Sequence, residues 1–104
     1  MTNFTVRVEL HGATSGQYEQ LHEAMEAKGF VRWVKNGNGE KDQLPTAEYN
    51  MQDTGLTRDQ VHARARGAAD SVKPSPHPSI LTTESAGRTW SGLTPWKAPV
   101  RSRY

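Results

Sequence analysis

Three polar side chains with complementary chemistry lie close together near the N-terminus. Arg7, Glu9 and His11 alternate with apolar residues, and alternate residues of a strand point to the same face of its sheet. A guanidinium can oppose the charge of a phosphodiester, while a carboxylate or an imidazole acts as the base. We therefore predict a catalytic site at Arg7, Glu9 and His11. Cross-strand ion pairs on an exposed sheet face are the alternative.

A second group of candidate residues lies near the C-terminus, where basic and aromatic side chains are interleaved. No acidic residue follows Glu84 in the sequence. Aromatic rings can stack on bases while basic groups pair with phosphates. The sequence therefore predicts a nucleic-acid-binding tail that contains Arg88, Trp96, Lys97 and Arg101. We expect Trp90 to pack against the end of the core instead.

Residue types and spacings do not favour other kinds of site. The chain has no cysteine, which excludes disulfides, thiolate metal sites and a cysteine nucleophile. Its four histidines do not form the i, i+4 pair of a zinc protease, and Gly-x-Ser-x-Gly does not occur. We expect no metal and no cofactor.

The elements that position these residues follow from hydrophobic periodicity and capping signals. Residues 4–11 alternate between apolar and polar, which predicts a half-buried strand. Helices are predicted over 15–28 and 57–72. Each begins at a Thr-x-x-Gln capping box, and Gly29 provides a left-handed end for the first.

Three further strands are expected between and after the helices. Residues 30–35 are rich in strand formers, and the two Asn-Gly pairs that follow predict a hairpin. The return strand is predicted from Gln43 to about Tyr49 or Met51, at a sheet edge because Pro45 lacks an amide proton. A proline-rich linker separates the second helix from a last strand over 79–84.

This βαββαβ order is typical of a ferredoxin-like α+β fold. It predicts a four-stranded antiparallel sheet with two helices on one face, formed by residues 1–86. Residues 87–104 form an irregular basic, aromatic C-terminal tail that packs partly through Trp90. The predicted core includes one face of the second strand together with Phe4, Val6, Val8, Leu10, Leu21, Met25, Val61, Ala65, Val72 and Leu81.

Length and composition indicate the size class of this protein and the compartment that we expect for it. A chain of 104 residues is the usual size of one domain, and 34% hydrophobic residues suggest that part of it lies outside the core. The sequence shows neither a signal peptide nor an apolar run long enough for a membrane span. We expect a cytoplasmic protein without a membrane partner.

Several stretches of the chain resemble a known family. Residues 4–13, 18–22 and 43–49, together with Thr83, Glu84 and 88–90, resemble small bacterial and phage-borne proteins of the GhoS-like type V antitoxin family. The resemblance covers about residues 3–92. It implies a ferredoxin-like fold, RNA binding and endoribonuclease cleavage of a toxin messenger RNA. CRISPR-associated nucleases with this fold have an aspartate at the end of the first strand, where this chain has Glu9-Leu10-His11.

Two functions therefore stay open at the level of sequence. One is an antitoxin-type RNA-binding protein or endoribonuclease that uses the polar face of the first strand. The other is a non-catalytic protein-binding module, such as a phage-borne inhibitor, that uses the open sheet face, a strand edge or the tail. The partner is then RNA or a protein, and a dimer is compatible with both.

Overall fold

The protein is a mixed α+β domain, seen in a computed structural model that describes residues 3–52 and 55–98. In chain order its elements are β1 (Asn3–Glu9), α1 (Ser15–Ala27), β2 (Trp33–Lys35), β3 (Lys41–Gln43), β4 (Glu48–Gln52), α2 (Arg58–Val72) and β5 (Ser79–Ser85). The α+β class and the order of the helices are confirmed. Neither helix is long and apolar enough to cross a membrane, as far as the described residues go.

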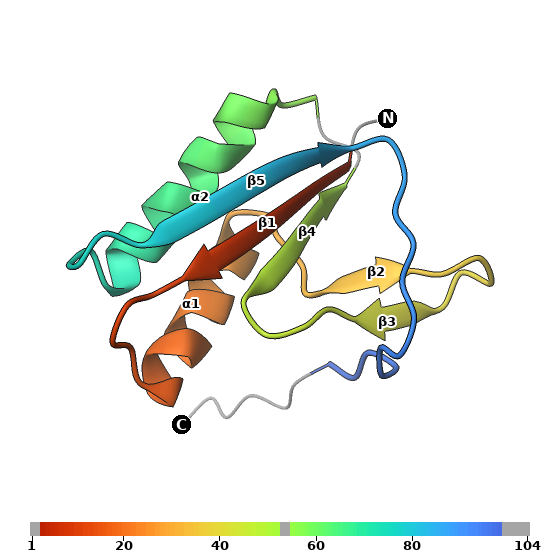
Figure 1. Cartoon of the computed structure of the whole chain (residues 1–104), viewed down its shortest axis with the longest axis horizontal. Helices are drawn as coiled ribbons and strands as arrows, with labels where there is room; N and C mark the ends of the chain where they lie inside the picture. Colours follow the sequence, from red (N-terminus) through yellow and green to blue (C-terminus); the bar gives the residue numbers. More distant parts are fainter. Residues whose placement is uncertain (1–2, 53–54, 99–104) are drawn as a thin grey trace.

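The strands form two sheets rather than the single four-stranded sheet predicted. β4, β1 and β5 form an antiparallel sheet in that order, and β2 pairs with β3 in a separate hairpin. A single bridge between Val31 and Asn50 connects the hairpin strand to β4. Both helices lie behind the three-stranded sheet in Figure 1, so its other side, the open face, carries no helix.

The return strand predicted from Gln43 onward is divided into β3 and β4 by a turn at Pro45. The Pro45 carbonyl accepts the Glu48 amide at 3.1 Å, and Ala47 has a φ of 70°. Proline cannot donate to a sheet ladder, and a positive φ is incompatible with a strand. The break lets the β2–β3 hairpin turn away from the main sheet (Figure 1).

Both helices begin where the sequence predicts. The Thr14 hydroxyl accepts the Gln17 amide at 3.1 Å, and the Gln17 side chain accepts the Thr14 amide at 2.9 Å. Thr57 and Gln60 form the same reciprocal pair. Gly29 has a φ of 95° just beyond the C-cap of α1, the left-handed conformation expected there. The two helices thus start and stop through local interactions alone.

The core lies between the helices and the three-stranded sheet. The even-numbered residues of β1 and its continuation to Leu10 are buried, as predicted, and so are Leu21, Met25, Val61 and Ala65. Val72 packs only at the rim of this core. The prediction for Leu81 is wrong, because this side chain is 64% exposed.

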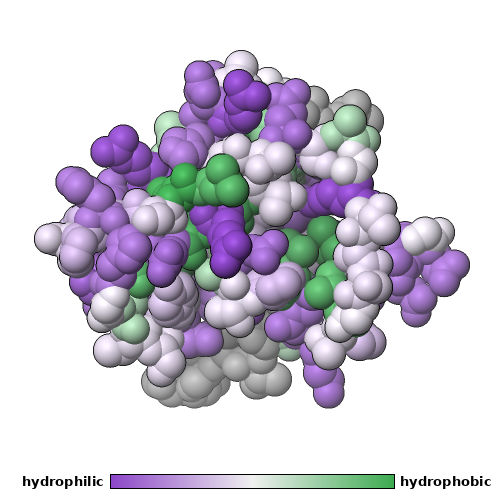
Figure 2. Space-filling view, in the orientation of Figure 1, coloured by the Kyte–Doolittle hydropathy of each residue, from purple (hydrophilic) through white to green (hydrophobic). Residues whose placement is uncertain are grey.

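The register between β1 and β5 explains the exposure of Leu81. Thr82 pairs with Val6 and Ile80 with Val8, so the even-numbered residues of β5 share the helix side of the sheet with the apolar residues of β1. Leu81 pairs with Arg7 on the open face. In the space-filling view, apolar atoms are exposed over β5 (Figure 2).

A buried polar pair joins α1 to β4. The Tyr49 hydroxyl lies 2.6 Å from His22 Nδ1, and both residues are buried. Desolvation raises the pKa of the Tyr49 hydroxyl well above its usual range, and the nearby Arg32 charge offsets part of this effect. The folded protein therefore holds the Tyr49 proton more tightly than the unfolded chain does.

This difference predicts a loss of stability in alkali. A group whose pKa is raised by folding adds its full contribution to the free energy of unfolding below its unfolded pKa. This contribution is lost as the pH rises toward the folded pKa. The free energy of unfolding should fall above about pH 10, by up to about 1.4 kcal/mol per pH unit from this group. Urea unfolding of the wild type and of Tyr49→Phe from about pH 8 to 11 checks this. Parallel decline in the two proteins contradicts it.

Candidate functional site on the open sheet face

The open face of the three-stranded sheet is made by the odd-numbered residues of β1 and their cross-strand neighbours. Thr5 pairs with Asn50 and Thr83, Arg7 with Glu48 and Leu81, and Glu9 with Ser79. The hairpin lies beside β4 in Figure 1, and residues of the segment 86–98 share a cleft with Thr5 and Glu48 of this face, so the β4 side is partly covered. The other end, toward His11, remains uncovered (Figure 1).

Arg88 fixes the segment 86–98 to the covered half. Its Nη1 donates to Asn50 Oδ1 at 2.8 Å and to Thr5 Oγ1 at 3.3 Å. Asn50 is fully buried, and its amide nitrogen donates to the Trp33 carbonyl. Burial lowers the pKa of Arg88 from its ordinary value, although a guanidinium remains charged in proteins. Arg88 thus connects β1, β4 and the hairpin through neutral acceptors.

The rest of this segment follows the edge of β3. The Gln43 amide donates to the Thr94 carbonyl at 2.8 Å, and the Trp96 amide donates to the Lys41 carbonyl at 2.9 Å. Trp90 Nε1 donates to Asp42 Oδ2 at 3.0 Å. Trp90 therefore packs against the hairpin rather than at the end of the main core.

The segment and the hairpin enclose a second, smaller apolar cluster. Leu93 and the half-buried Trp90 line a cleft of about 300 Å³ together with Val34, Leu44 and Pro45. Figure 2 shows apolar atoms in this region of the molecule as well. Residues 86–98 therefore pack against the hairpin.

The predicted tail residues have different surroundings. Arg88 is half-buried in the contacts just described. Trp96 is half-buried and lines a hollow beside Lys41 and Asp42, whereas Lys97 is exposed. Arg101 lies outside the described residues. The role of these four residues in binding nucleic acid stays a prediction.

The uncovered half brings together the three residues predicted to be catalytic. His11 Nε2 lies 2.7 Å from Ser79 Oγ, and His11 Nδ1 lies 4.0 Å from Glu9 Oε2. Arg7 precedes Glu9 by two residues on the same face of β1. A shallow pocket of about 180 Å³ is lined by Arg7, Glu9, Ser79, Ile80 and Leu81. We name Arg7, Glu9, His11 and Ser79 the His11 cluster.

Ser79 is the member of this cluster that sequence reasoning missed. It is the first residue of β5, and it reaches His11 because β5 pairs antiparallel to β1 with Ser79 opposite Glu9. A serine at a strand start carries no signal of its own. The strand order would have indicated its neighbourhood, but only the register places its hydroxyl beside the imidazole.

The charges around the His11 cluster distinguish acid–base chemistry from simple anion binding. Arg7 is exposed and has Glu48 of β4 as its cross-strand neighbour. The cluster itself then holds one guanidinium and one carboxylate beside an imidazole. Such a set can position and move protons.

The arrangement does not suggest a metal centre. Within residues 3–52 and 55–98, no three His, Asp or Glu side chains come together in a way that could hold a metal ion. The imidazole of His11 is instead adjacent to one hydroxyl and one carboxylate.

Comparison with known proteins adds no further constraint. No protein-family model matches this chain, and no curated protein matches it.

The contacts of Arg88 predict a stabilising role that can be measured. Arg88→Ala leaves the buried Asn50 oxygen without its donor, so the free energy of unfolding should fall by about 1–3 kcal/mol. Lys97→Ala, an exposed basic residue of the same segment, should change it by less than about 0.5 kcal/mol. Urea unfolding gives both values. Faster hydrogen exchange at the Gln43 amide in Arg88→Ala would show that the segment detaches, and equal stability of the two variants would refute the proposed contact.

Proposed function

We propose that this protein binds RNA on the uncovered half of its open face and cleaves it without a metal ion. The observation that supports this proposal is the Ser79–His11–Glu9 array beside Arg7. It combines a base with a hydroxyl that can orient it, a carboxylate beside it and a cation for the phosphate.

The cleavage step can be assigned to atoms of this cluster. In the tautomer in which His11 Nε2–H donates to Ser79 Oγ, Nδ1 carries the lone pair and faces Glu9. Nδ1 takes the proton of a ribose 2′-hydroxyl, whose oxygen attacks the adjacent phosphorus. The bond from phosphorus to the 5′-oxygen breaks, that oxygen takes a proton from water, and the hydroxide so formed takes back the proton held by Nδ1. The products are a 2′,3′-cyclic phosphate and a free 5′-hydroxyl.

Two charges stabilise this step. The Glu9 carboxylate lies on the side of Nδ1 and favours the imidazolium that forms. Arg7, on the same face of β1, opposes the negative charge that grows on the phosphate oxygens. Ser79 holds the imidazole ring and takes no part in bond making.

The fold and the resemblance to GhoS-like antitoxins indicate a biological role for this activity. We propose that the β4–β1–β5 sheet and the Val31–Asn50 bridge represent a ferredoxin-like order in which β2 is reduced to an edge. The GhoS-like resemblance then favours an antitoxin that acts on a toxin messenger RNA in the cytoplasm. The exposed Lys97 and the half-buried Trp96 are candidates to extend the RNA interface.

The proposal predicts the effect of removing the base. His11→Ala should reduce cleavage of a mixed RNA substrate by at least about a hundredfold, since general bases typically contribute 10²- to 10⁴-fold. His77→Ala, which removes an exposed histidine of the linker, should leave the rate unchanged. Gel analysis of RNA after incubation with each purified protein, with EDTA present, measures both rates.

Two further measurements, of folding and of the reaction products, complete this test. Thermal unfolding should show that His11→Ala is folded, because its half-buried side chain lies outside the core. The products should carry cyclic phosphate, which mass spectrometry detects. Equal cleavage by wild type and His11→Ala, or cleavage that EDTA abolishes, would reject the mechanism.

A further inference from the structure

The outer edge of β5 is free to accept another strand. β5 is the last strand in the order β4–β1–β5, and no described strand pairs with its other side. Residues 79–85 contain no Lys, Arg or Pro, and Glu84 is the one charged residue among them. This edge therefore has little of the usual protection against strand addition.

The register identifies the backbone groups that point outward. The Val8 amide donates to the Ala47 carbonyl at 2.9 Å, so the even-numbered residues of β1 bond toward β4. The odd-numbered residues then bond to their β5 partners, Leu81 and Thr83 among them. It follows that Ile80, Thr82 and Glu84 direct their amides and carbonyls to the free edge.

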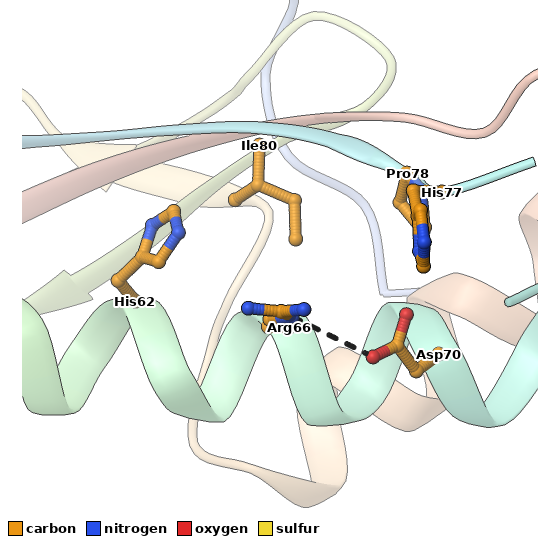
Figure 3. A pocket seen from close by; sticks show the side chains of 6 residues that line it. All are labelled: His62, Arg66, Asp70, His77, Pro78 and Ile80. Atoms are coloured by element: carbon orange, nitrogen blue, oxygen red, sulfur yellow. Dashed lines mark ion pairs between the residues drawn. The ribbon is translucent and has the colours of Figure 1, made fainter.

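A groove runs beside this edge, between β5 and α2. In Figure 3 the side chains of His62, Arg66 and Asp70 rise from α2, and Ile80 points down from β5 toward them. His77 and Pro78 close one end, and the hollow has a volume of about 150 Å³. His62 Nδ1 lies 2.8 Å from Thr82 Oγ1, which fixes the helix against the strand. An added strand would thus have side chains of α2 along one flank.

The groove side of α2 carries two arginines at a spacing that matches a strand. Arg58, His62, Arg66 and Asp70 follow one another at intervals of four residues, about 6 Å along a helix and close to the rise of two strand residues, so the acidic member of this row stands at its C-terminal end. The Arg66 side chain is 67% exposed. Its Nε lies 3.8 Å from Asp70 Oδ2, beyond hydrogen-bonding distance, so this exposed guanidinium can donate to a further acceptor.

We propose that this groove binds an extended acidic peptide segment, which adds as an antiparallel strand to β5. Residues of the peptide opposite Ile80, Thr82 and Glu84 exchange backbone hydrogen bonds with them and point their side chains toward α2. A carboxylate opposite Ile80 then faces Arg66, and Ile80 supplies an apolar contact beneath it. The groove is thus a protein-recognition site on the other side of β5 from the His11 cluster.

The same features disfavour a second copy of this chain as the occupant. Antiparallel pairing of two β5 edges would bring the two α2 helices, with Arg58 and Arg66 on their facing sides, toward one another. A single extended segment brings no helix and can supply carboxylates instead. An RNA strand would meet the arginines but has no amide and carbonyl ladder to match the edge of β5.

The test uses a fluorescein-labelled peptide of alternating threonine and glutamate with the full chain. It should bind, whereas the matched peptide with lysine in place of glutamate should not. Arg66→Glu and Arg66→Ala should weaken binding by about tenfold or more. Arg64→Glu is the matched control, because Arg64 lies on the same helix but its guanidinium reaches the Lys28 carbonyl. RNA cleavage should be unchanged in all three variants.

Hydrogen exchange separates strand addition from plain charge attraction. With the peptide bound, the amides of Ile80, Thr82 and Glu84 should exchange at least about tenfold more slowly. Those of Leu81 and Thr83, already bonded to β1, should not change. Binding without this protection, equal weakening by Arg64→Glu, or the same effects from a poly-uridine oligomer would overturn the proposal. If these three amides become protected without peptide as the protein concentration rises, the edge of β5 binds a second copy of the chain instead.

Discussion

The alternation of side chains along β1 is the constraint on which both the core and the candidate site depend. β1 is the central strand, paired on both sides, and its even-numbered residues fill the space under the helices. A shift of one residue in its register would expose Phe4, Val6 and Val8 and bury Arg7 and Glu9, at a cost that no surface contact could offset. The same packing that stabilises the domain therefore presents Arg7, Glu9 and His11 on the open face. The His11 cluster needs no dedicated loop to hold it in place.

A second constraint decides which part of that face is accessible. The turn at Pro45 and Ala47 lets the hairpin leave the main sheet, and the segment 86–98 then runs along β3. Asn50 lies under both and is fully buried, so its polar atoms must be satisfied by Trp33 and Arg88. Leaving the side-chain nitrogen or oxygen of Asn50 without a partner would cost more free energy than the hydrogen bond itself contributes to stability. This network keeps the covered half closed and leaves the opposite end, with the His11 cluster, open to solvent.

The features that the sequence predicts well are those encoded over a few residues. Capping boxes at Thr14 and Thr57, the positive φ of Gly29 and the alternation of β1 all depend on near neighbours. The exposure of Leu81, the contact of Ser79 with His11 and the inward turn of Arg88 depend on contacts between residues 38 to 83 positions apart. A strand such as β5, with similar residues on both faces, does not reveal which face is buried. The division at Pro45 lies between these cases, because proline signals an interruption but not where the chain goes next.

β5 connects the two proposed sites through its two sets of side chains. Its odd-numbered residues, Ser79 and Leu81, belong to the open face, and its even-numbered residues, Ile80 and Thr82, line or adjoin the groove beside α2. Ile80 lines both the groove and the shallow pocket beside Arg7, whereas the charged residues of the two sites differ. The backbone of β5 is shared, however, and an added strand would restrict its motion and that of Ser79. If such restriction favours the arrangement in which Ser79 holds His11, peptide and RNA would each strengthen the binding of the other by the same factor, since thermodynamic coupling is reciprocal.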